Sequence, residues 1–266
     1  MDAALSPSAL RDLVAARTPF TLVDVRRPEA FDRDPAMLPG AVRRPPADVE
    51  RWGRELPAWR PVVVYCVHGH EVSRDAAAAL RLLGLRAQAL DGGLEAWRAD
   101  GGRLVPHRPP TRWVTRARPK IDRLACPWFI RRFVDADAIV DYVPAGRVLA
   151  HACDTGATPF DVPDVEYAHV CHFCSFDAFV ARHAPDDDAL AALADIVRAA
   201  DTDRLDDASQ AAGLLAVSLG LGRLIDDDAT LLRHALLVYD ALYAWCLGAG
   251  GGRHGRGASA LRKGAG

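Results

Sequence analysis

The sequence has little that would tie the protein to a membrane or to an oxidising compartment. The longest apolar run, residues 211–222, is too short to cross a bilayer and contains glycines. The first ten residues lack the basic start and the apolar stretch of a signal peptide. Only six cysteines are spread over 266 residues, too few for a disulfide framework. We therefore expect a protein of the reducing cytoplasm that has no membrane partner.

The chain also lacks an excess of charge of either sign. Lysine and arginine together number 33 and aspartate and glutamate 35, so the formal net charge is −2. A balance of this kind gives no general electrostatic attraction to nucleic acid. No DNA-reading motif is present either, and we do not expect a nucleic-acid partner. Half of the residues are apolar, as in globular proteins, and the length allows two cores of ordinary domain size.

Residues 1–102 alternate between strand-like and helix-like patterns. Strands are expected at 21–25, 62–65 and 88–90, and helices after Ser6, at 46–56, at 73–83 and around Trp97. The run 62–65 is β-branched, which is typical of a strand buried on both faces. This alternation predicts an α/β domain with a parallel sheet flanked by helices.

The remaining residues predict a linker, a second domain and a tail. Three prolines and two glycines in 101–110, without apolar periodicity, predict an interdomain linker over 103–111. A second, mostly helical α+β domain is expected over 112–247. Its strands are expected near 112–115, 138–143 and 147–152, and its helices near 175–183, 187–200, 209–223 and 228–246. The glycine-rich tail, 248–266, is expected to be disordered because it has too little apolar surface to bury.

Cys66 stands directly after the predicted strand 62–65 and before the helix expected from Ser73. In an open parallel sheet, ligands bind at the carboxyl ends of the strands. Gly69 permits a backbone turn that points amides inward, and such amides, with the N-terminus of the next helix, favour an anion. The same field favours the thiolate form of Cys66, which can attack a sulfur atom and hold it as a persulfide. The expected loop consists of Val67, His68, Gly69, His70, Glu71 and Val72.

Two histidines of this loop, His68 and His70, can add positive charge or transfer protons. A cysteine at a strand end can equally be an ordinary buried side chain. Taken without its surroundings, Cys66 fits that structural interpretation better. The flanking motifs change the balance.

The flanking motifs occur in a fixed order along the first hundred residues. They are Leu22-Val23-Asp24-Val25-Arg26, Pro28-Glu29-Ala30-Phe31, Leu38-Pro39-Gly40-Ala41, Val64-Tyr65-Cys66 and Leu90-Asp91-Gly92-Gly93-Leu94-Glu95-Ala96-Trp97. In this order and spacing, residues 5–102 resemble the rhodanese family. The resemblance implies a sulfurtransferase in which Cys66 accepts the sulfur and the loop 67–72 cradles the substrate. It also implies that Asp24 and Arg26 help to hold that loop.

The implied reaction needs no cofactor. A small-molecule donor, thiosulfate or a persulfide, supplies the sulfur, and a thiol or cyanide accepts it. The stretch from Cys66 to Val72 has seven residues, one more than in common single-domain rhodaneses, and no arginine. A longer loop is typical of rhodanese-fold phosphatases and arsenate reductases, but those close it with an arginine where this chain has Val72. Sulfur transfer is therefore favoured, and a thiol-dependent chromate or arsenate reductase is the alternative.

Several cations precede or open a helical pattern in the second domain. Arg116, Arg118, Lys120 and Arg123 lie near a helix start, where the macrodipole disfavours positive charge. Cations kept there indicate a nearby anion or carboxylate. Ion pairs within the chain, with Asp122, with Asp135 or with acids of later helices, explain them equally well. Further on, a proline at position 127 predicts either a kink or a second helix start.

The segment 166–174 concentrates residues that bind metals. Cys171 and Cys174 have the spacing of a zinc half-site, but no second matching pair exists. A mixed site formed by Glu166, His169 and Asp201 would be a metal site of a different kind. Ordinary buried cysteines and histidines are the more common alternative. A metal ion in the second domain is therefore an open expectation.

Six motifs of the second domain resemble the C-terminal domain of the ChrB chromate-resistance family. They lie at 113–116, 118–123, 125–133, 156–161, 174–177 and 196–201. The resemblance implies a link with chromate resistance and makes chromate or another oxyanion a candidate ligand. It points to Lys120, Asp122, Arg123, Glu166, His169 and Asp201 as candidate site residues. A chromate-responsive sensor is a further alternative, against which the balanced charge argues.

Overall fold

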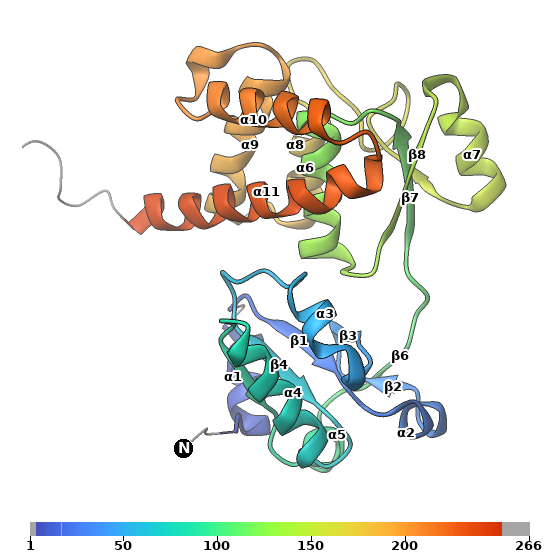
Figure 1. The fold of residues 1–266 in the computed structure, drawn as a ribbon, viewed down its shortest axis with the longest axis vertical. Helices are drawn as coiled ribbons and strands as arrows, with labels where there is room; N and C mark the ends of the chain where they lie inside the picture. The colour runs from blue at the N-terminus through green and yellow to red at the C-terminus, as the bar shows by residue number, and fades with distance from the viewer. Residues whose placement is uncertain (1–3, 17, 252–266) are drawn as a thin grey trace, which may run out of the picture. The chain divides into compact units, whose positions relative to one another are not determined.

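The computed structural model describes residues 4–16 and 18–251. These residues divide into two compact units between Pro109 and Pro110, which is inside the predicted linker. We call them unit 1 and unit 2 and describe each by itself (Figure 1). In the residues described, no helix is long and apolar enough to cross a membrane.

Unit 1 is built on a four-stranded parallel sheet, which confirms the predicted architecture. The strand order is β3-β1-β4-β5. These strands are β1 (Thr21–Asp24), β3 (Ala41–Arg43), β4 (Val62–Tyr65) and β5 (Ala87–Ala89). In the register of the sheet, Val23 of β1 pairs with Val42 on one side and with Val64 on the other. The strands β1 and β4 are buried along their whole length because helices cover both faces of the sheet.

Among the residues described, unit 1 has five helices, and two of them cover each face of its sheet. They are α1 (Pro7–Ala15), α2 (Pro28–Arg33), α3 (Val49–Gly53), α4 (Glu71–Leu82) and α5 (Gly93–Ala99), with a 3₁₀ turn, η1 (Pro46–Asp48), before α3. Trp52 of α3 and Leu80 of α4 pack on the face that carries Val64. Leu10 of α1 and Trp97 of α5 pack on the face that carries Tyr65. Adjacent residues of β4 thus point to opposite cores, as the two-residue period of a strand requires.

Part of the predicted linker belongs to unit 1. Val105–Pro106 form a short strand, β6, which pairs antiparallel with β2 (Ala36–Met37). Two residues show no apolar period, and for this reason the pairing could not be recognised from the sequence. The predicted linker 103–111 is therefore too long at its N-terminal end.

Unit 2 has a three-stranded parallel sheet with the order β8-β7-β9. Its strands are β7 (Arg112–Arg116), β8 (Ile139–Val143) and β9 (Thr158–Pro159). The strand predicted at 147–152 is wrong, because a 3₁₀ turn, η3 (Ala145–Arg147), and a helix, α7 (Val148–Thr155), occupy this stretch. Val148 is the only buried residue of α7, so its apolar residues do not mark a core strand.

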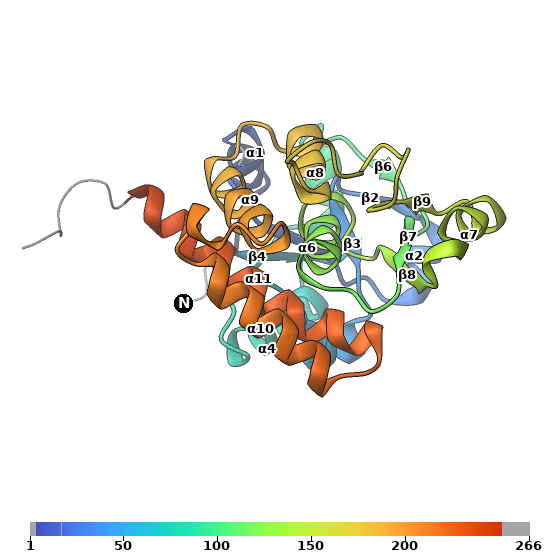
Figure 2. The same cartoon turned by 90° about the horizontal axis from the view of Figure 1, so that it is seen from above.

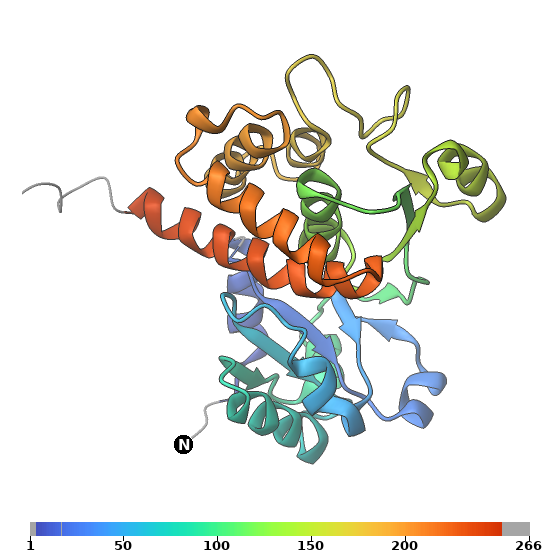
Figure 3. The same ribbon diagram turned by 45° about the horizontal axis from the view of Figure 1, so that its top comes forward.

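The other helices confirm that unit 2 is mostly helical. They are α6 (Ile121–Phe129), α8 (Ser175–His183), α9 (Asp188–Asp201), α10 (Ala211–Leu224) and α11 (Asp228–Gly251), with a π turn, η2 (Ile130–Val134), and a 3₁₀ turn, η4 (Leu205–Asp207). Helix α6 packs against α8, α9, α10 and α11 (Figure 2). Helices α10 and α11 lie side by side (Figure 3). The predicted tail begins too early, because α11 continues to Gly251; residues 252–266 lie outside the described chain.

Helix α6 runs through Pro127 without a second start. A proline inside a helix leaves the carbonyl four residues earlier without its usual donor. Here that carbonyl belongs to Arg123, and the hydroxyl of Tyr142 donates to it at 3.4 Å. The π turn that follows α6 then ends the helical segment at Val134.

Candidate functional site

Cys66 lies at the carboxyl end of β4, at the position where parallel sheets bind ligands. The residue is 6% exposed. Its Sγ lies 3.2 Å from the hydroxyl of Ser73, a buried residue of α4. The Ser73 hydroxyl also lies 3.3 Å from the carbonyl oxygen of His70, to which it can donate. The thiol is therefore held next to a polar group at the start of a helix.

The loop after Cys66 is shorter than predicted. Helix α4 begins at Glu71, so Glu71 and Val72 belong to its first turn and the loop spans only Val67–His70. Ser73 was expected to open the helix, but its side chain contacts the Cys66 thiol and His70 instead. Glu71 suits the first turn because a carboxylate there compensates the helix dipole. The rings of His68 and His70 are exposed, with centroids 6.0 Å apart.

The backbone of the loop has unused hydrogen-bond donors. In the described part of the chain, the amides of Val67, His68, Gly69 and His70 donate no hydrogen bond. Gly69 adopts φ 68°, a left-handed conformation that side chains disfavour. Four consecutive free amides next to a thiol and a helix N-terminus are suited to an anion. Their inward direction stays a prediction.

The N-terminus of α5 holds this loop in place. Leu94 donates its amide hydrogen to the carbonyl of Cys66 at 2.9 Å, and Glu95 donates to that of Val67 at 3.1 Å. A Cβ atom on Gly93 would lie 2.4 Å from the Cys66 oxygen, and one on Gly69 would lie 2.5 Å from the Gly92 nitrogen. Only glycine permits this approach. In the sequence, the start of α5 is recognisable as a motif, but its role in supporting the Cys66 loop is not. The two adjacent glycines of that motif were the available signal for such a close approach.

Asp24 and Arg26 are fully buried as an ion pair, but they hold a different segment from the one predicted. Arg26 Nε donates to both carboxylate oxygens of Asp24, at 3.0 and 2.9 Å. Its two terminal nitrogens donate to the carbonyls of Asp34, at 2.7 Å, and Ala36, at 2.9 Å. The expectation that Arg26 holds residues 67–72 is thus corrected. Asp24 reaches the loop only indirectly, since it accepts from the hydroxyl of Tyr65 at 3.2 Å.

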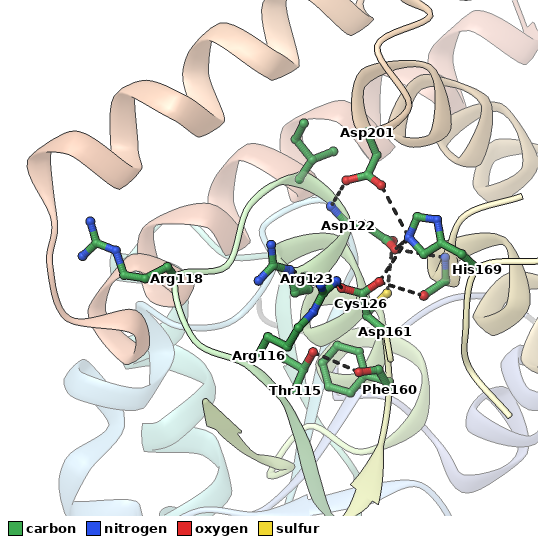
Figure 4. Close-up of polar contacts among 12 residues, drawn as sticks. Thr115, Arg116, Arg118, Asp122, Arg123, Cys126, Phe160, Asp161, His169 and Asp201 are labelled. Carbon is green, nitrogen blue, oxygen red and sulfur yellow. Dashed lines mark hydrogen bonds and ion pairs between the residues drawn. The ribbon is translucent and has the colours of Figure 1, made fainter. Parts of the chain in front are cut away.

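Unit 2 gathers charged side chains at the carboxyl ends of β7 and β9 (Figure 4). Arg116 ends β7, and Asp161 follows β9. Asp122 lies in the first turn of α6, Asp201 is the last residue of α9, and His169 belongs to the irregular segment between β9 and α8. We call Asp122, Asp161, His169 and Asp201 the acidic–histidine cluster.

The ring of His169 is the centre of this cluster. Its Nε2 lies 3.2 Å from Asp122 Oδ2, 3.1 Å from Asp161 Oδ1 and 3.5 Å from Asp201 Oδ2. Hydrogen bonds with Asp122 and Asp161 raise the pKa of His169 to about 10. Burial, with the charge of Asp122 next, raises the pKa of Asp201 to about 6. Single ligand atoms of Asp122, His169 and Asp201 lie within 4.8 Å of one another, close enough to hold one metal ion.

Asp122 is fixed by the start of another helix. Its two carboxylate oxygens accept the backbone amides of Ser175 and Phe176, the first residues of α8, both at 2.9 Å. A carboxylate at this position compensates the positive end of the α8 dipole. The thiol of Cys126 donates a hydrogen bond to Asp122 Oδ1 at 3.3 Å, and burial raises the pKa of this thiol.

Asp161 is fixed by two arginines and was not among the predicted site residues. Its Oδ2 lies 2.7 Å from a terminal nitrogen of Arg116 and 3.2 Å from Nε of Arg123. Burial acts to raise the pKa of Asp161, but hydrogen bonds from His169 and Arg116 outweigh it and lower the value. The available signal was the motif at 156–161, which ends on this aspartate.

The structure separates other residues that the sequence had grouped. Glu166 pairs with Arg182 at 2.7 Å and lies on the exposed surface, so Asp122 takes its place among the candidate ligands. Lys120 is exposed at the N-cap of α6 and makes no described contact with the cluster. Cys171 is exposed on a tight turn, whereas Cys174 is buried at the N-cap of α8. In the part of the chain that the structure describes, neither cysteine belongs to the group of side chains close enough together to hold a metal ion.

The cations near α6 have carboxylate partners within unit 2. Arg116 and Arg123 pair with Asp161, and Arg118 pairs with Asp226 at 3.1 Å. The ion-pair explanation therefore accounts for three of the four cations. Acids from other elements of the unit, rather than Asp122, are the partners.

Known proteins resemble the two units separately. Residues 6–100 match the model of the rhodanese-like domain, and residues 113–246 match that of the ChrB C-terminal domain. Protein ChrB of Cupriavidus metallidurans is 32% identical over 145 residues, which are 52% of this chain and 43% of that protein. The chain thus spans less than half the length of this curated relative.

Two of the solved structures that are similar to this chain each match 38% of its residues. A rhodanese-related protein from Thermoplasma volcanium is 24% identical with a TM-score of 0.34, and 96% of that chain is covered. The Alr3790 protein from Anabaena is 30% identical with a TM-score of 0.34, and 79% of that chain is covered. Together, the model matches account for both units: the chain belongs to the ChrB C-terminal domain family and carries a rhodanese-like domain in front of that domain.

Proposed function

We propose that unit 1 is a sulfurtransferase in which Cys66 carries a sulfane sulfur as a persulfide. The observation that carries the proposal is the position of Cys66, at the carboxyl end of β4 and directly before four amides without a described hydrogen-bond partner. The match of residues 6–100 to the rhodanese-like domain supports it. No cofactor is required.

The first half of the reaction loads the sulfur. The Cys66 thiolate attacks the outer sulfur of thiosulfate and forms a new S–S bond. The old S–S bond breaks, and sulfite leaves with the electron pair. If the donor is a persulfide, the donor's thiolate leaves in the same way. The terminal sulfur on Cys66 then carries the negative charge, which the loop amides and the N-terminus of α4 stabilise.

The second half returns the enzyme to its starting state. A thiolate or cyanide attacks the terminal sulfur, and Cys66 leaves as a thiolate. The products are a new persulfide or thiocyanate. The Ser73 hydroxyl, 3.2 Å from Cys66 Sγ, can donate a hydrogen bond to the thiolate in both halves of the reaction.

The test is mass spectrometry of the purified full chain after incubation with thiosulfate. We expect Cys66 to gain one sulfur atom and to lose it when cyanide is added. Cys66→Ser is expected to abolish both the gain and thiocyanate formation. Cys153→Ser is a matched control, because Cys153 is another free cysteine but is exposed on α7. Unchanged turnover in Cys66→Ser would defeat the assignment.

We also propose that this activity belongs to the response to chromate or a related oxyanion. The ChrB relationship supports the link. The loop Val67–His70 contains no arginine, which favours sulfur transfer over an oxyanion reductase. Chromate reduction at the expense of thiols, lost in Cys66→Ser without any sulfur loading of the wild type, would favour the reductase instead.

A further inference from the structure

The acidic–histidine cluster has more acceptors than its histidine can satisfy. Nε2 of His169 carries at most one hydrogen. Oxygens of three different carboxylates nevertheless lie within 3.5 Å of it. One N–H group cannot make three good hydrogen bonds. Carboxylate oxygens that converge on one point in this way can all be satisfied by a multivalent cation but not by a single proton.

The three carboxylates differ in how well other groups satisfy them. Asp122 accepts two backbone amides of α8, and Asp161 pairs with two arginines. Asp201 Oδ1 has one long contact, 3.5 Å from the amide of Asp122. Among the described residues, Asp201 Oδ2 has no partner except His169. Asp201 is therefore the carboxylate with most to gain from a cation.

We propose that Asp122, His169 and Asp201 bind one divalent metal ion. Single ligand atoms of the three lie within 4.8 Å of one another, so one ion can reach all of them. Asp161 is the weaker fourth candidate, because Arg116 and Arg123 already neutralise its charge. When the metal binds, the proton of His169 Nε2 leaves to solvent. The ion takes its place and contacts His169 and both carboxylates at once.

The surroundings hold the ligands in place, as metal sites require. The start of α8 orients Asp122, and the arginine pair orients Asp161 beside the ring of His169. Asp122 is 2% exposed, whereas His169 is 42% exposed, so the site has a buried floor and an open side toward solvent. An ion can enter from that side, and three protein ligands leave coordination positions for water or a small anion.

The donor set indicates which ions fit. An imidazole nitrogen suits zinc, iron and similar first-row ions, and carboxylates suit these and manganese. An all-oxygen site would instead favour magnesium or calcium. Cys126 is not a ligand here, since its thiol donates to Asp122 Oδ1. We therefore expect Mn²⁺ and Zn²⁺ to bind and Mg²⁺ to compete poorly.

The test uses the full chain, stripped with a chelator and titrated with Mn²⁺. Bound Mn²⁺ is separated from free Mn²⁺ by electron paramagnetic resonance, a readout that does not depend on the cysteines. We expect one Mn²⁺ per chain, displaced by Zn²⁺. Asp201→Asn keeps the shape of the side chain but removes the charge of a direct ligand, so it is expected to weaken binding by more than the about 10–100-fold that the loss of a group supporting a ligand costs.

Glu166→Gln is the matched control, because Glu166 lies three positions from His169 but pairs with Arg182. It is expected to bind Mn²⁺ like the wild type. Failure of the wild type to bind Mn²⁺ or Zn²⁺, or equal binding by Asp201→Asn, would show that the cluster is only a network of ion pairs. Circular dichroism of Asp201→Asn verifies that it folds, and His169→Gln provides a second variant. Sulfur loading of Cys66 is a separate measurement, so either proposal can fail alone.

Discussion

The site around Cys66 and the acidic–histidine cluster are built in opposite ways. The first consists of one thiol and the backbone amides of the residues that directly follow it. The second consists of side chains from separate elements; Asp122 and Asp201 are 79 positions apart. Both lie at the carboxyl ends of parallel strands. The site around Cys66 should tolerate changes of its loop side chains but not of its glycines. The acidic–histidine cluster should instead be sensitive to changes of its charged side chains.

The largest expected effect concerns the buried ion pair of unit 1. Arg26→Met leaves the Asp24 carboxylate buried without its partner, which costs about 3–5 kcal/mol of folding free energy. Urea unfolding of the full chain, followed separately for each unit, should show the loss in unit 1 only. Arg27→Met, at the exposed neighbouring position, is the control and should change stability little. Equal losses in the two variants would contradict the role of Arg26.

A second prediction concerns the backbone of the Cys66 loop. In Gly69→Ala, the left-handed φ costs about 1–2 kcal/mol, and the overlap with Gly92 adds about 1–3 kcal/mol. Gly84→Ala separates the two costs, because Gly84 also has a positive φ, 85°, but nothing within 4 Å of its Cβ position. Thermal unfolding should show the greater loss for Gly69→Ala, which should also lose sulfur loading. If both variants load sulfur equally, the close packing of the loop does not matter for the reaction.

A smaller effect is expected from the residues that orient the cluster. Arg116→Gln removes one of the two cations that neutralise Asp161 and should modestly strengthen Mn²⁺ binding, because the freed carboxylate and the lost positive charge both favour a cation beside His169. Arg112→Gln is the control on the same strand, since Arg112 pairs with Asp141 instead. Mn²⁺ titration followed by electron paramagnetic resonance measures both. Sulfur loading should be unchanged in both variants, which would show that the two sites are independent.

The smallest effect is expected at Cys171. Because this residue is exposed and is not one of the three grouped ligand residues, Cys171→Ser should alter neither Mn²⁺ binding nor sulfur loading of Cys66. A loss of metal binding in this variant would restore the half-site formed by Cys171 and Cys174. Mn²⁺ titration by electron paramagnetic resonance and mass spectrometry after thiosulfate measure metal binding and sulfur loading on the same preparation.

Much of unit 1 could be predicted because its signals are local. The β-branched run 62–65 reads as a buried strand, and Cys66 follows it directly. The boundary of α4 was misplaced by two residues because Ser73, a good N-cap by type, uses its hydroxyl on Cys66 and His70. The support of the loop by Leu94 and Glu95 also could not be read, since nothing in a linear pattern states which carbonyls an amide will meet.

By itself, the sequence determined the alternating elements of unit 1, the place of Cys66 at a strand end and the mostly helical nature of unit 2. Apolar periods, glycines and helix starts act over a few residues, so these features need no knowledge of distant contacts. Only the tertiary structure decided that Asp122, and not Glu166, joins His169 and Asp201, and that Arg26 holds residues 34–36. These choices depend on how α6, α8 and α9 pack and how β1 meets its neighbours, and packing brings together side chains that no local pattern relates.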